Sequence, residues 1–337
     1  MNKESSIFGS RKTRNMTQHL SKFTICGDKN SNSAWSIRYP DQKTVAAVIV
    51  TYYPDEALLQ RLKGIASQFD ELIIIDNTPN NEAKKILDSA AKQHKCRLII
   101  NKENLGIATA LNQGAEFALD IGLFWVAFFD QDSLVMPSYL KVMRHIYESY
   151  GNQPRIGIIG ANYIHPVTGL PALQSAVGNN AEFFEVESVI TSGSLLNLEA
   201  FKAVGKFRDE FFIDQVDEEY CLRLRSHGWK VLISREPLLV CRIGSPAMRR
   251  LWTKKIYPSN HPPIRRYYIT RNRFVLWKEY LLREPRWVAR SFRCALIELI
   301  LILLCEDQKF PKLKAMALGA LHGAIGRMGR LEVPWGL

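Results

Sequence analysis

The stretch "LFWVAFFDQDSLVMP", residues 123–137, decides the fold of this 337-residue chain. Residues 123–129 are all apolar, and such a run predicts a strand that is buried on both faces of a sheet. Asp130 and Asp132 follow it, one residue apart. Two carboxylates this close raise each other's pKa unless something positive lies between them. The stretch therefore indicates a buried strand that ends at a binding site for a cation or a positively charged group.

Strands and helices alternate on both sides of this stretch. The pattern predicts strands at 44–53, 71–76, 96–101, 123–129 and 155–161, and helices at 54–68, 80–94, 107–121 and 137–150. This alternation is typical of an α/β fold with a doubly wound, mostly parallel sheet. In such sheets, ligands bind beyond the carboxyl ends of the strands. The polar residues expected at those ends are Thr51, Asp76, Asn77, Asn104, Asp130 and Asp132.

The pattern changes after residue 160. Residues 186–198 predict a strand and a turn, and a helix with an acidic start is expected to run to His227, with Gly228 as its stop. The region from about residue 246 to 337 is basic, aromatic and expected to be mainly helical. Residues 1–43 are polar and lack an apolar signal segment, so they predict a flexible leader on a cytoplasmic protein.

The charge is concentrated near the C-terminus. The chain has a formal net charge of +12, and residues 248–330 hold 18 Lys and Arg against 5 Asp and Glu. Such an excess favours an anionic partner, either membrane headgroups, a polyphosphate ligand or nucleic acid. The six cysteines form no CxxC pair, which argues against a zinc ribbon or a disulfide framework.

The apolar run at 295–305 is about half the roughly 20 residues that a spanning helix needs. Basic residues flank it on both sides, at Arg286, Arg290, Arg293, Lys309, Lys312 and Lys314. Two interpretations remain open. The run forms either a helix that lies on an anionic membrane surface or a buried core helix with solvated charges at its ends.

Two carboxylates at the end of a strand can hold Mg²⁺ or Mn²⁺, which prefer oxygen ligands and often share them with substrate phosphates. On a surface loop, the same Asp-x-Asp pattern is usually plain solvated charge. The preceding apolar strand favours a metal site at Asp130 and Asp132. Asp76 is either a turn residue or a hydrogen-bond acceptor for a nucleoside. Asn104 and Gly106 allow a close ligand approach at a helix start, although an ordinary loop explains them equally well.

Acidic residues cluster in "FIDQVDEEYCLR", residues 212–223. The acids are Asp214, Asp217, Glu218 and Glu219. Acids in the first turn stabilise a helix through their interaction with its dipole, but four acids within six positions are more than this stabilisation requires. One of them is therefore a candidate general base, which would take a proton from an attacking hydroxyl.

Taken in order, these motifs resemble the family-2 inverting glycosyltransferases of GT-A fold, and among them the bacterial rhamnosyltransferase group. The motifs that carry the resemblance are "TYYP", "IIIDN", "NLGIATALNQG", "FFDQDS", "TSGSLL" and "FIDQVDEEYCLR". The resemblance covers about residues 44–245, the expected catalytic domain, and extends through "RRYYITRN" at 265–272.

The resemblance implies roles for individual residues. Nucleotide-sugar binding falls to Thr51, Asp76, Asn104, Gly106 and Asp130. The metal, Mg²⁺ or Mn²⁺, falls to Asp130 and Asp132, and the catalytic base is Asp217. The sugar or acceptor side falls to Ser192, Gly193, Ser194 and Glu218.

One position departs from the family pattern. The family often has His-x-x-Gly after the last strand, with the His as third metal ligand, whereas this chain has "CRIG" with Cys241 in that place. A thiol is a softer ligand and suits Mg²⁺ or Mn²⁺ poorly. The third ligand therefore stays open between Cys241 and water.

The resemblance implies transfer of a sugar, L-rhamnose from dTDP-rhamnose, to a hydroxyl of a lipid-linked surface polysaccharide. The basic C-terminal region would then work beside the inner face of the cell membrane. The alternative is a non-catalytic nucleotide-sugar-binding or regulatory protein with the same fold. The presence of Cys241 supports this alternative, and the presence of Asp130, Asp132 and Asp217 argues against it. No recognised reading motif supports nucleic acid as a partner. The sequence carries no sign of an oligomeric state.

Overall fold

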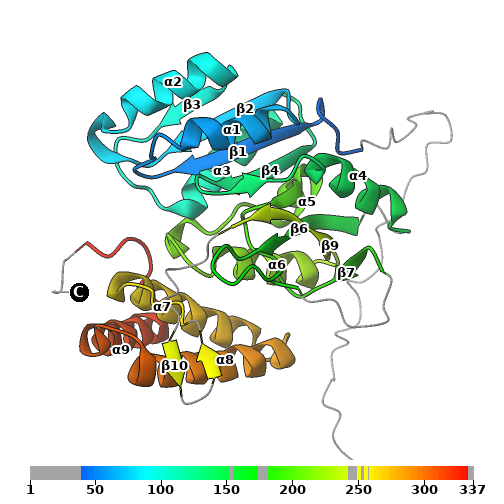
Figure 1. Cartoon of the computed structure of the whole chain (residues 1–337). Coiled ribbons are helices and arrows are strands. Elements are labelled where there is room, and N and C mark those ends of the chain that lie inside the picture. Colours follow the sequence, from blue (N-terminus) through cyan, green and yellow to red (C-terminus); the bar gives the residue numbers. More distant parts are fainter. Residues whose placement is uncertain are drawn as a thin grey trace, which may run out of the picture. The chain divides into compact units, whose positions relative to one another are not determined.

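The strand predicted from the opening stretch is β4 (Trp125–Asp130), which lies inside a nine-stranded sheet (Figure 1). The computed structural model describes residues 39–151, 155–173, 181–241, 249–251, 254–256 and 258–332. Of the predicted leader, residues 1–38 lie outside the described residues. Every structural statement below refers to the described part of the chain.

The first half of the sheet is parallel, as predicted. It has the order β3-β2-β1-β4, formed by β3 (Arg97–Ile100), β2 (Glu71–Asp76), β1 (Val45–Thr51) and β4. In register, Thr51 pairs with Asp76, and Val50 pairs with Asp130. The carboxyl ends of β1, β2 and β4 therefore meet at one edge of the sheet, which brings Thr51, Asp76 and Asp130 to that edge.

The second half of the sheet is mixed, so "mostly parallel" describes only the first half. Strand β8 (Ser194–Asn197) runs antiparallel between β4 and β6 (Ile156–Ile164). Strand β9 (Lys230–Val240) is parallel to β6, while the short strands β5 (Leu134–Val135) and β7 (Phe183–Glu185) pair with it in antiparallel fashion. Parallel neighbours in a sheet need a long crossover, usually a helix. The described residues between β6 and β8 contain no helix, which agrees with the antiparallel pairing of these two strands.

Alternate residues of the central strands enter two separate cores, which explains why the strands are apolar throughout. Ala46 and Val48 face a core with helices α3 (Ile107–Asp120), α5 (Leu198–Val204) and α6 (Val216–Ser226). Val45 and Ala47 face the opposite core, with α1 (Leu58–Ala66), α2 (Lys84–His94) and α4 (Tyr139–Ser149). Short 3-10 turns occur at η1 (Pro79–Asn81) and η3 (Asp209–Phe211). Burial on both faces is the expected property of a parallel sheet covered by helices.

The C-terminal region is mainly helical, as predicted, and includes one hairpin that was not predicted. The helices are α7 (Pro263–Tyr280), α8 (Pro285–Cys305) and α9 (Lys309–Ile325), preceded by β10 (Arg249–Leu251) and β11 (Lys254–Ile256). Helices α7 and α9 approach closely at two glycines. A Cβ atom on Gly319 or Gly323 would lie 2.5 Å from a backbone carbonyl oxygen of α7.

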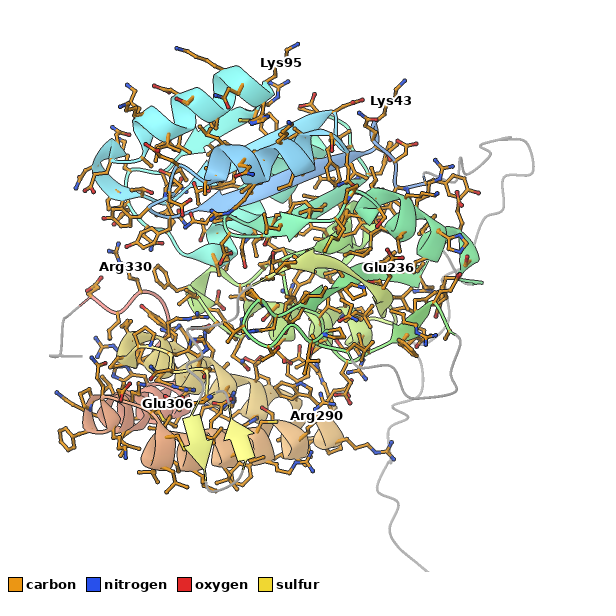
Figure 2. The ribbon with its side chains drawn as sticks, in the orientation of Figure 1. Lys43, Lys95, Glu236, Arg290, Glu306 and Arg330 are labelled. Carbon is orange, nitrogen blue, oxygen red and sulfur yellow. The ribbon has the colours of Figure 1, made fainter. Side chains whose placement is uncertain are left out.

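A buried ion network ties the three C-terminal helices together. Arg266 of α7 donates to one carboxylate oxygen of Glu306 at 2.8 Å, and Lys312 of α9 donates to the other at 2.9 Å. Glu306, which follows the last residue of α8, is labelled among these helices in Figure 2. Lys312 is thus a structural residue rather than one of the solvated flanking charges that the sequence suggested. No described helix combines the length and apolar character that crossing a bilayer requires.

Candidate active site

A pocket of about 320 Å³ lies where the carboxyl end of β4 meets the start of α6. Its walls combine residues that are far apart in the sequence. They are Ile107, Asp130, Ile190, Thr191, Ser192, Ile213, Asp214, Val216, Asp217, Cys241 and Arg265. Of the residues expected at the site, Asp130, Ser192, Asp217 and Cys241 therefore come together in this pocket.

Thr51 and Asp76 form a buried polar group at the ends of β1 and β2. One oxygen of the Asp76 carboxylate, Oδ1, accepts from the hydroxyl of Thr51 at 2.7 Å and from that of Thr78 at 2.8 Å. The other oxygen, Oδ2, is buried and has no hydrogen-bond partner. Leaving a buried acceptor unpaired costs about 1–3 kcal/mol, so Oδ2 is suited to a donor supplied by a ligand.

Two exposed tyrosines stand directly beside this group, and the sequence analysis did not assign them. Tyr52 and Tyr53 are each about half exposed, and their rings pack edge to face. Gln131, between the two aspartates, holds Tyr52 by accepting from its N–H at 2.8 Å and donating to its carbonyl at 3.1 Å. The strand predicted at 44–53 included both tyrosines, whereas β1 ends at Thr51, so no signal of their exposure was visible in the sequence.

The loop at Asn104 and Gly106 is built by its own hydrogen bonds. The side chain of Asn104 accepts from the N–H of Gly106 at 2.9 Å, and Asn77 donates to the Gly106 carbonyl at 3.0 Å. Gly106 has φ of +89°, and a Cβ atom there would lie 2.5 Å from the carbonyl oxygen of Phe212. The glycine thus lets the start of α3 approach the loop that precedes α6.

The two aspartates do not lie on the same strand. β4 ends at Asp130, and Asp132 lies in the following turn, where it is exposed. Burial and the charge of Asp132 raise the pKa of Asp130 to about 6, and Arg265 opposes this shift. The two carboxylates are therefore close enough to repel each other, which is the condition under which a shared cation is favourable.

Cys241, which stands at the family's His position in the resemblance, lines the same pocket as Asp130. Burial, followed by the charges of Asp130 and Asp132, raises the pKa of its thiol to about 12, although hydrogen bonds with Ser133 and Ser192 act in the opposite direction. The thiol is thus neutral at physiological pH, and a neutral thiol is a poor ligand for a hard cation. The rest of "CRIG", residues 242–244, lies outside the described residues.

No group of three or more carboxylate, histidine or cysteine ligands is arranged for a metal ion in the described part of the chain. Two carboxylates are nevertheless what Mg²⁺ commonly takes from a protein when substrate phosphates and water complete its shell. Asp130 and Asp132 therefore fit a cation that binds together with a phosphorylated substrate.

Asp217 stands in the first turn of α6 on the wall of the pocket. Burial raises its pKa to about 7, and the nearby charges of Glu218 and Asp214 act in the same direction. Two other acids of this cluster have basic partners: Glu219 pairs with Arg223 at 2.8 Å, and Asp214 pairs with Arg265. A carboxylate with a pKa near neutrality and no ion pair within the described residues is suited to accept a proton.

Glu218 is less suited than Asp217 to act as the base. Its carboxylate accepts a hydrogen bond of 2.9 Å from the indole Nε1 of Trp287, a buried residue of α8. Among the "TSGS" residues, Ser192 reaches the pocket and its Oγ accepts from the N–H of Asp130 at 3.1 Å. Gly193 and Ser194 support this turn instead, through bonds to the carbonyls of Phe128 and Thr191 at 2.7 Å each.

The loop between η3 and α6 has an unusual backbone. Phe212, Asp214 and Gln215 have φ values of 64°, 64° and 61°, in the left-handed region that residues other than glycine rarely adopt. Asn272 of α7 donates to the carbonyls of Ile213 at 2.9 Å and Asp214 at 2.8 Å. Such bonds can hold a strained loop in place, because strain persists only where the surroundings determine the conformation.

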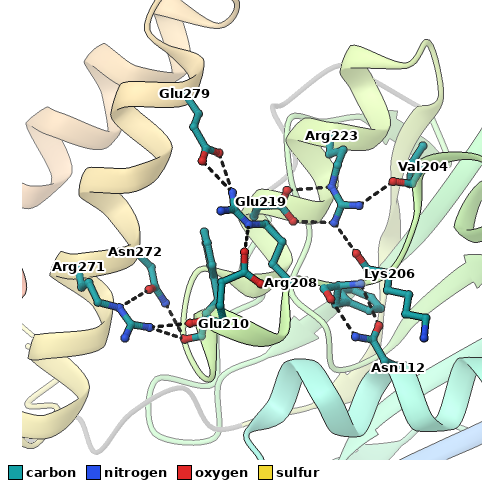
Figure 3. Close-up of polar contacts among 12 residues, drawn as sticks. Asn112, Val204, Lys206, Arg208, Glu210, Glu219, Arg223, Arg271, Asn272 and Glu279 are labelled. Carbon is teal, nitrogen blue, oxygen red and sulfur yellow. Dashed lines mark hydrogen bonds and ion pairs between the residues drawn. The ribbon is translucent and has the colours of Figure 1, made fainter. Parts of the chain in front are cut away.

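Arg271 reinforces the same loop from the adjacent position on α7. Its guanidinium donates to the carbonyls of Glu210 at 3.1 Å and Phe211 at 2.9 Å, and Asn272 also reaches the Phe211 carbonyl at 3.1 Å (Figure 3). Both side chains are fully buried. The sequence analysis included them in the resemblance at "RRYYITRN" but assigned them no role, because nothing local indicates which segment they contact.

The family model for glycosyl transferase family 2 matches residues 46–205. A dTDP-rhamnosyl transferase, RfbF of Shigella flexneri, is 31% identical over 306 residues, which are 85% of this chain and 97% of that protein.

Solved structures show only weak similarity. The S. aureus protein TarS, residues 1–349, matches with 12% identity and a TM-score of 0.47, over 84% of this chain and 72% of that chain. GalNAc-T7, solved with UDP, GalNAc and Mn²⁺, matches with 15% identity and a TM-score of 0.47, over 59% of this chain and 43% of that chain. The assignment does not depend on these structures. It follows from the match in sequence that the chain belongs to glycosyl transferase family 2 and is a glycosyltransferase with a GT-A type α/β fold.

Proposed function

We propose that this enzyme transfers L-rhamnose from dTDP-rhamnose to a hydroxyl of a lipid-linked surface polysaccharide, with inversion at the anomeric carbon. The donor is supported by the similarity to the Shigella flexneri dTDP-rhamnosyl transferase over 85% of this chain. The observation that carries the chemistry is that Asp130 and Asp217 line one pocket beyond the strand ends. Such a pocket would hold the donor diphosphate near Asp130 and place a proton acceptor, Asp217, in the same space.

The nucleoside would bind at the ends of β1 and β2. The unpartnered Oδ2 of Asp76 is suited to accept a hydrogen bond from the N3–H of thymine. Thr51 and Thr78 occupy the other oxygen and fix the orientation of the carboxylate. Tyr52 and Tyr53 provide exposed rings on which the base can stack, a contact that is worth about 1–3 kcal/mol for aromatic side chains and bases.

Asp130 and Asp132 would hold Mg²⁺ or Mn²⁺ together with the donor phosphates and water. When bound, such a cation neutralises the charge that develops on the departing nucleoside diphosphate. Cys241 would stay protonated beside the site, since burial and the two aspartates raise its pKa to about 12.

In the transfer step, the acceptor hydroxyl gives its proton to the carboxylate of Asp217, and the resulting oxygen nucleophile forms the new bond to the anomeric carbon. The bond from that carbon to the diphosphate oxygen breaks, and the electron pair leaves with thymidine diphosphate. Because attack and departure occur on opposite faces of the sugar, the configuration inverts. Ser192 would support the reaction from the acceptor side by holding the N–H of Asp130.

The acceptor is proposed from the C-terminal region, residues 246–337, beside the catalytic part at 44–245. Six large apolar side chains of α8 are between 45% and 57% exposed, so this helix is not the buried core helix that the sequence left open. They are Phe292, Leu296, Ile297, Ile300, Leu303 and Leu304. Arg286 and Arg293 lie on the same helix. An exposed apolar stripe with cationic residues fits the inner surface of an anionic membrane, where a lipid-linked acceptor would be presented.

The test is a panel of sugar nucleotides with and without Mg²⁺ or Mn²⁺, read as the shift in melting temperature and as transfer to a lipid-linked oligosaccharide. We expect dTDP-rhamnose with metal to give the largest shift, because a ligand that binds only the folded state stabilises it. Donor binding without transfer to any acceptor tested would favour the non-catalytic alternative. A larger response to another sugar nucleotide would overturn the rhamnose assignment.

A further inference from the structure

Arg265 is the one basic side chain among the described residues that line the pocket. It stands in the first turn of α7, and its guanidinium pairs with the carboxylate of Asp214 through two contacts, one of them from Nε at 3.2 Å. The side chain of Arg265 is 36% exposed, whereas that of Asp214 is only 9% exposed. The arginine is therefore the more accessible partner of this ion pair.

The charge of the Arg265 guanidinium acts on further carboxylates besides its ion-pair partner. Burial acts to lower the pKa of Arg265, but the hydrogen bond with Asp214 and the charges of Asp214, Asp130 and Asp217 outweigh it and raise the pKa. In return, Arg265 lowers the pKa of Asp130. One cation thus faces carboxylates that come from β4, from the loop before α6 and from α6 itself.

The backbone at Asp214 is held in position by residues other than Arg265. Its carbonyl accepts from Asn272 at 2.8 Å, and the carbonyls of Ile213 and Phe211, which precede it in the loop, accept from Asn272 and Arg271. The backbone of Asp214 is thus fixed by α7 independently of its side chain. The arginine can exchange partners while the loop remains in position.

We propose that Arg265 binds the diphosphate of the sugar-nucleotide donor, and that the phosphates replace Asp214 as its partner when the donor enters. This inference rests on the proposed function, because it assumes a nucleoside diphosphate ligand. A guanidinium presents a planar fork of donors that matches phosphate oxygens, and charge-assisted bonds of this kind are the stronger ones. A diphosphate carries more negative charge than a single carboxylate, so the exchange favours the bound donor.

The test is calorimetric titration of thymidine diphosphate and of thymidine into four proteins at one Mg²⁺ concentration. They are the wild type, Arg265→Met, Arg265→Lys and Asp214→Asn. We expect Arg265→Met to weaken thymidine diphosphate at least tenfold and to leave thymidine unchanged, with Arg265→Lys in between. Asp214→Asn releases the arginine from its competing partner, so it should bind the diphosphate as tightly as the wild type or more tightly.

The outcomes separate this inference from the proposed function. A wild-type protein that binds no thymidine diphosphate would contradict the proposed function itself. If the wild type binds it and Arg265→Met binds it equally well, the arginine is not a phosphate ligand. If Asp214→Asn loses as much affinity as Arg265→Met, the ion pair acts by supporting the loop and the inference fails. Melting temperatures of all four proteins control for folding, and Arg265→Lys with Asp214→Asn still decides the question should Arg265→Met not fold.

Discussion

At Asp217, burial and two neighbouring carboxylates act in the same direction and raise the pKa of the side chain to about 7. A general base of this kind contributes roughly 10²–10⁴-fold to a rate. We therefore expect Asp217→Asn to lower kcat by that factor and to leave the affinity for thymidine diphosphate within a few fold of the wild type. Steady-state kinetics and calorimetry would measure the two effects. A loss of affinity with normal turnover per bound donor would instead make Asp217 a binding residue.

The same carboxylate predicts a pH profile. Only its deprotonated form accepts the proton, so kcat should rise with pH through about 7 and should fall as the pH drops below that value. Glu218 contributes to the raised pKa of Asp217, and Glu218→Gln removes that charge while it keeps an acceptor for Trp287. We expect this variant to move the acidic limb of the kcat profile to lower pH. An unchanged limb would show that a group other than Asp217 controls it.

At the scale of elements, the sequence predicted local features well. Strand β2 was predicted with its observed bounds, and the helices at 107–121 and 137–150 differ from α3 and α4 by at most two residues at either end. Periodicity and end signals are local properties, so they can be read from one segment. The mixed half of the sheet depends on pairing between distant strands, and β8 lies between β4 and β6 for reasons that no single segment contains.

The site follows the same division. The positions of Asp76 and Asp130 at strand ends were predictable from the sequence, whereas the choice of Asp217 among the four acids around the start of α6 came only from the family resemblance and stays a prediction. Arg265 and Asn272 were not assigned roles, since their partners Asp214 and Ile213 lie more than 50 residues earlier in the chain. Only the packing of α7 against the loop before α6 brings these residues together.

The contact between α7 and this loop gives a prediction for one residue of the helix. Asn272→Ala removes the donor to three carbonyls, and each buried acceptor that loses its partner costs about 1–3 kcal/mol. We expect a lower melting temperature and a loss of kcat of about tenfold or more, with a smaller effect on the affinity for thymidine diphosphate. Asn272→Asp, which keeps the size but lacks the amide donors, should behave similarly.

Lys278→Ala on the same helix is the matched control, because Lys278 is exposed and, within the described part of the chain, donates only to the Ala324 carbonyl in α9. It should leave kcat and melting temperature near the wild-type values. If Asn272→Ala lowered the melting temperature but not kcat of the folded protein, the residue would support the fold without positioning Asp217.

At the scale of the whole molecule, the C-terminal region contacts the catalytic half at the places where the chemistry is expected, through the segment after α9 and through the start of α8. Arg330, labelled in Figure 2, donates to the carboxylate of Glu103 at 2.8 Å and lies beside the Asn104 loop. Trp287 in the first turn of α8 donates to Glu218, next to Asp217. The helix with the exposed apolar stripe therefore begins beside the acidic cluster that contains Asp217.

This arrangement predicts how the protein binds membranes. We expect the wild type to sediment with anionic lipid vesicles at low salt and to be released as the salt concentration rises, because basic residues and apolar burial both contribute. A variant with Leu296→Gln, Ile300→Gln and Leu303→Gln should bind at least tenfold more weakly, since full burial of one such side chain is worth about 1.5–3 kcal/mol. Leu134→Gln, at a residue of β5 that is 50% exposed, is the control and should bind as the wild type does. Wild-type protein that ignores anionic vesicles at low salt, or a triple variant that binds them normally, would show that α8 does not attach the enzyme to the membrane.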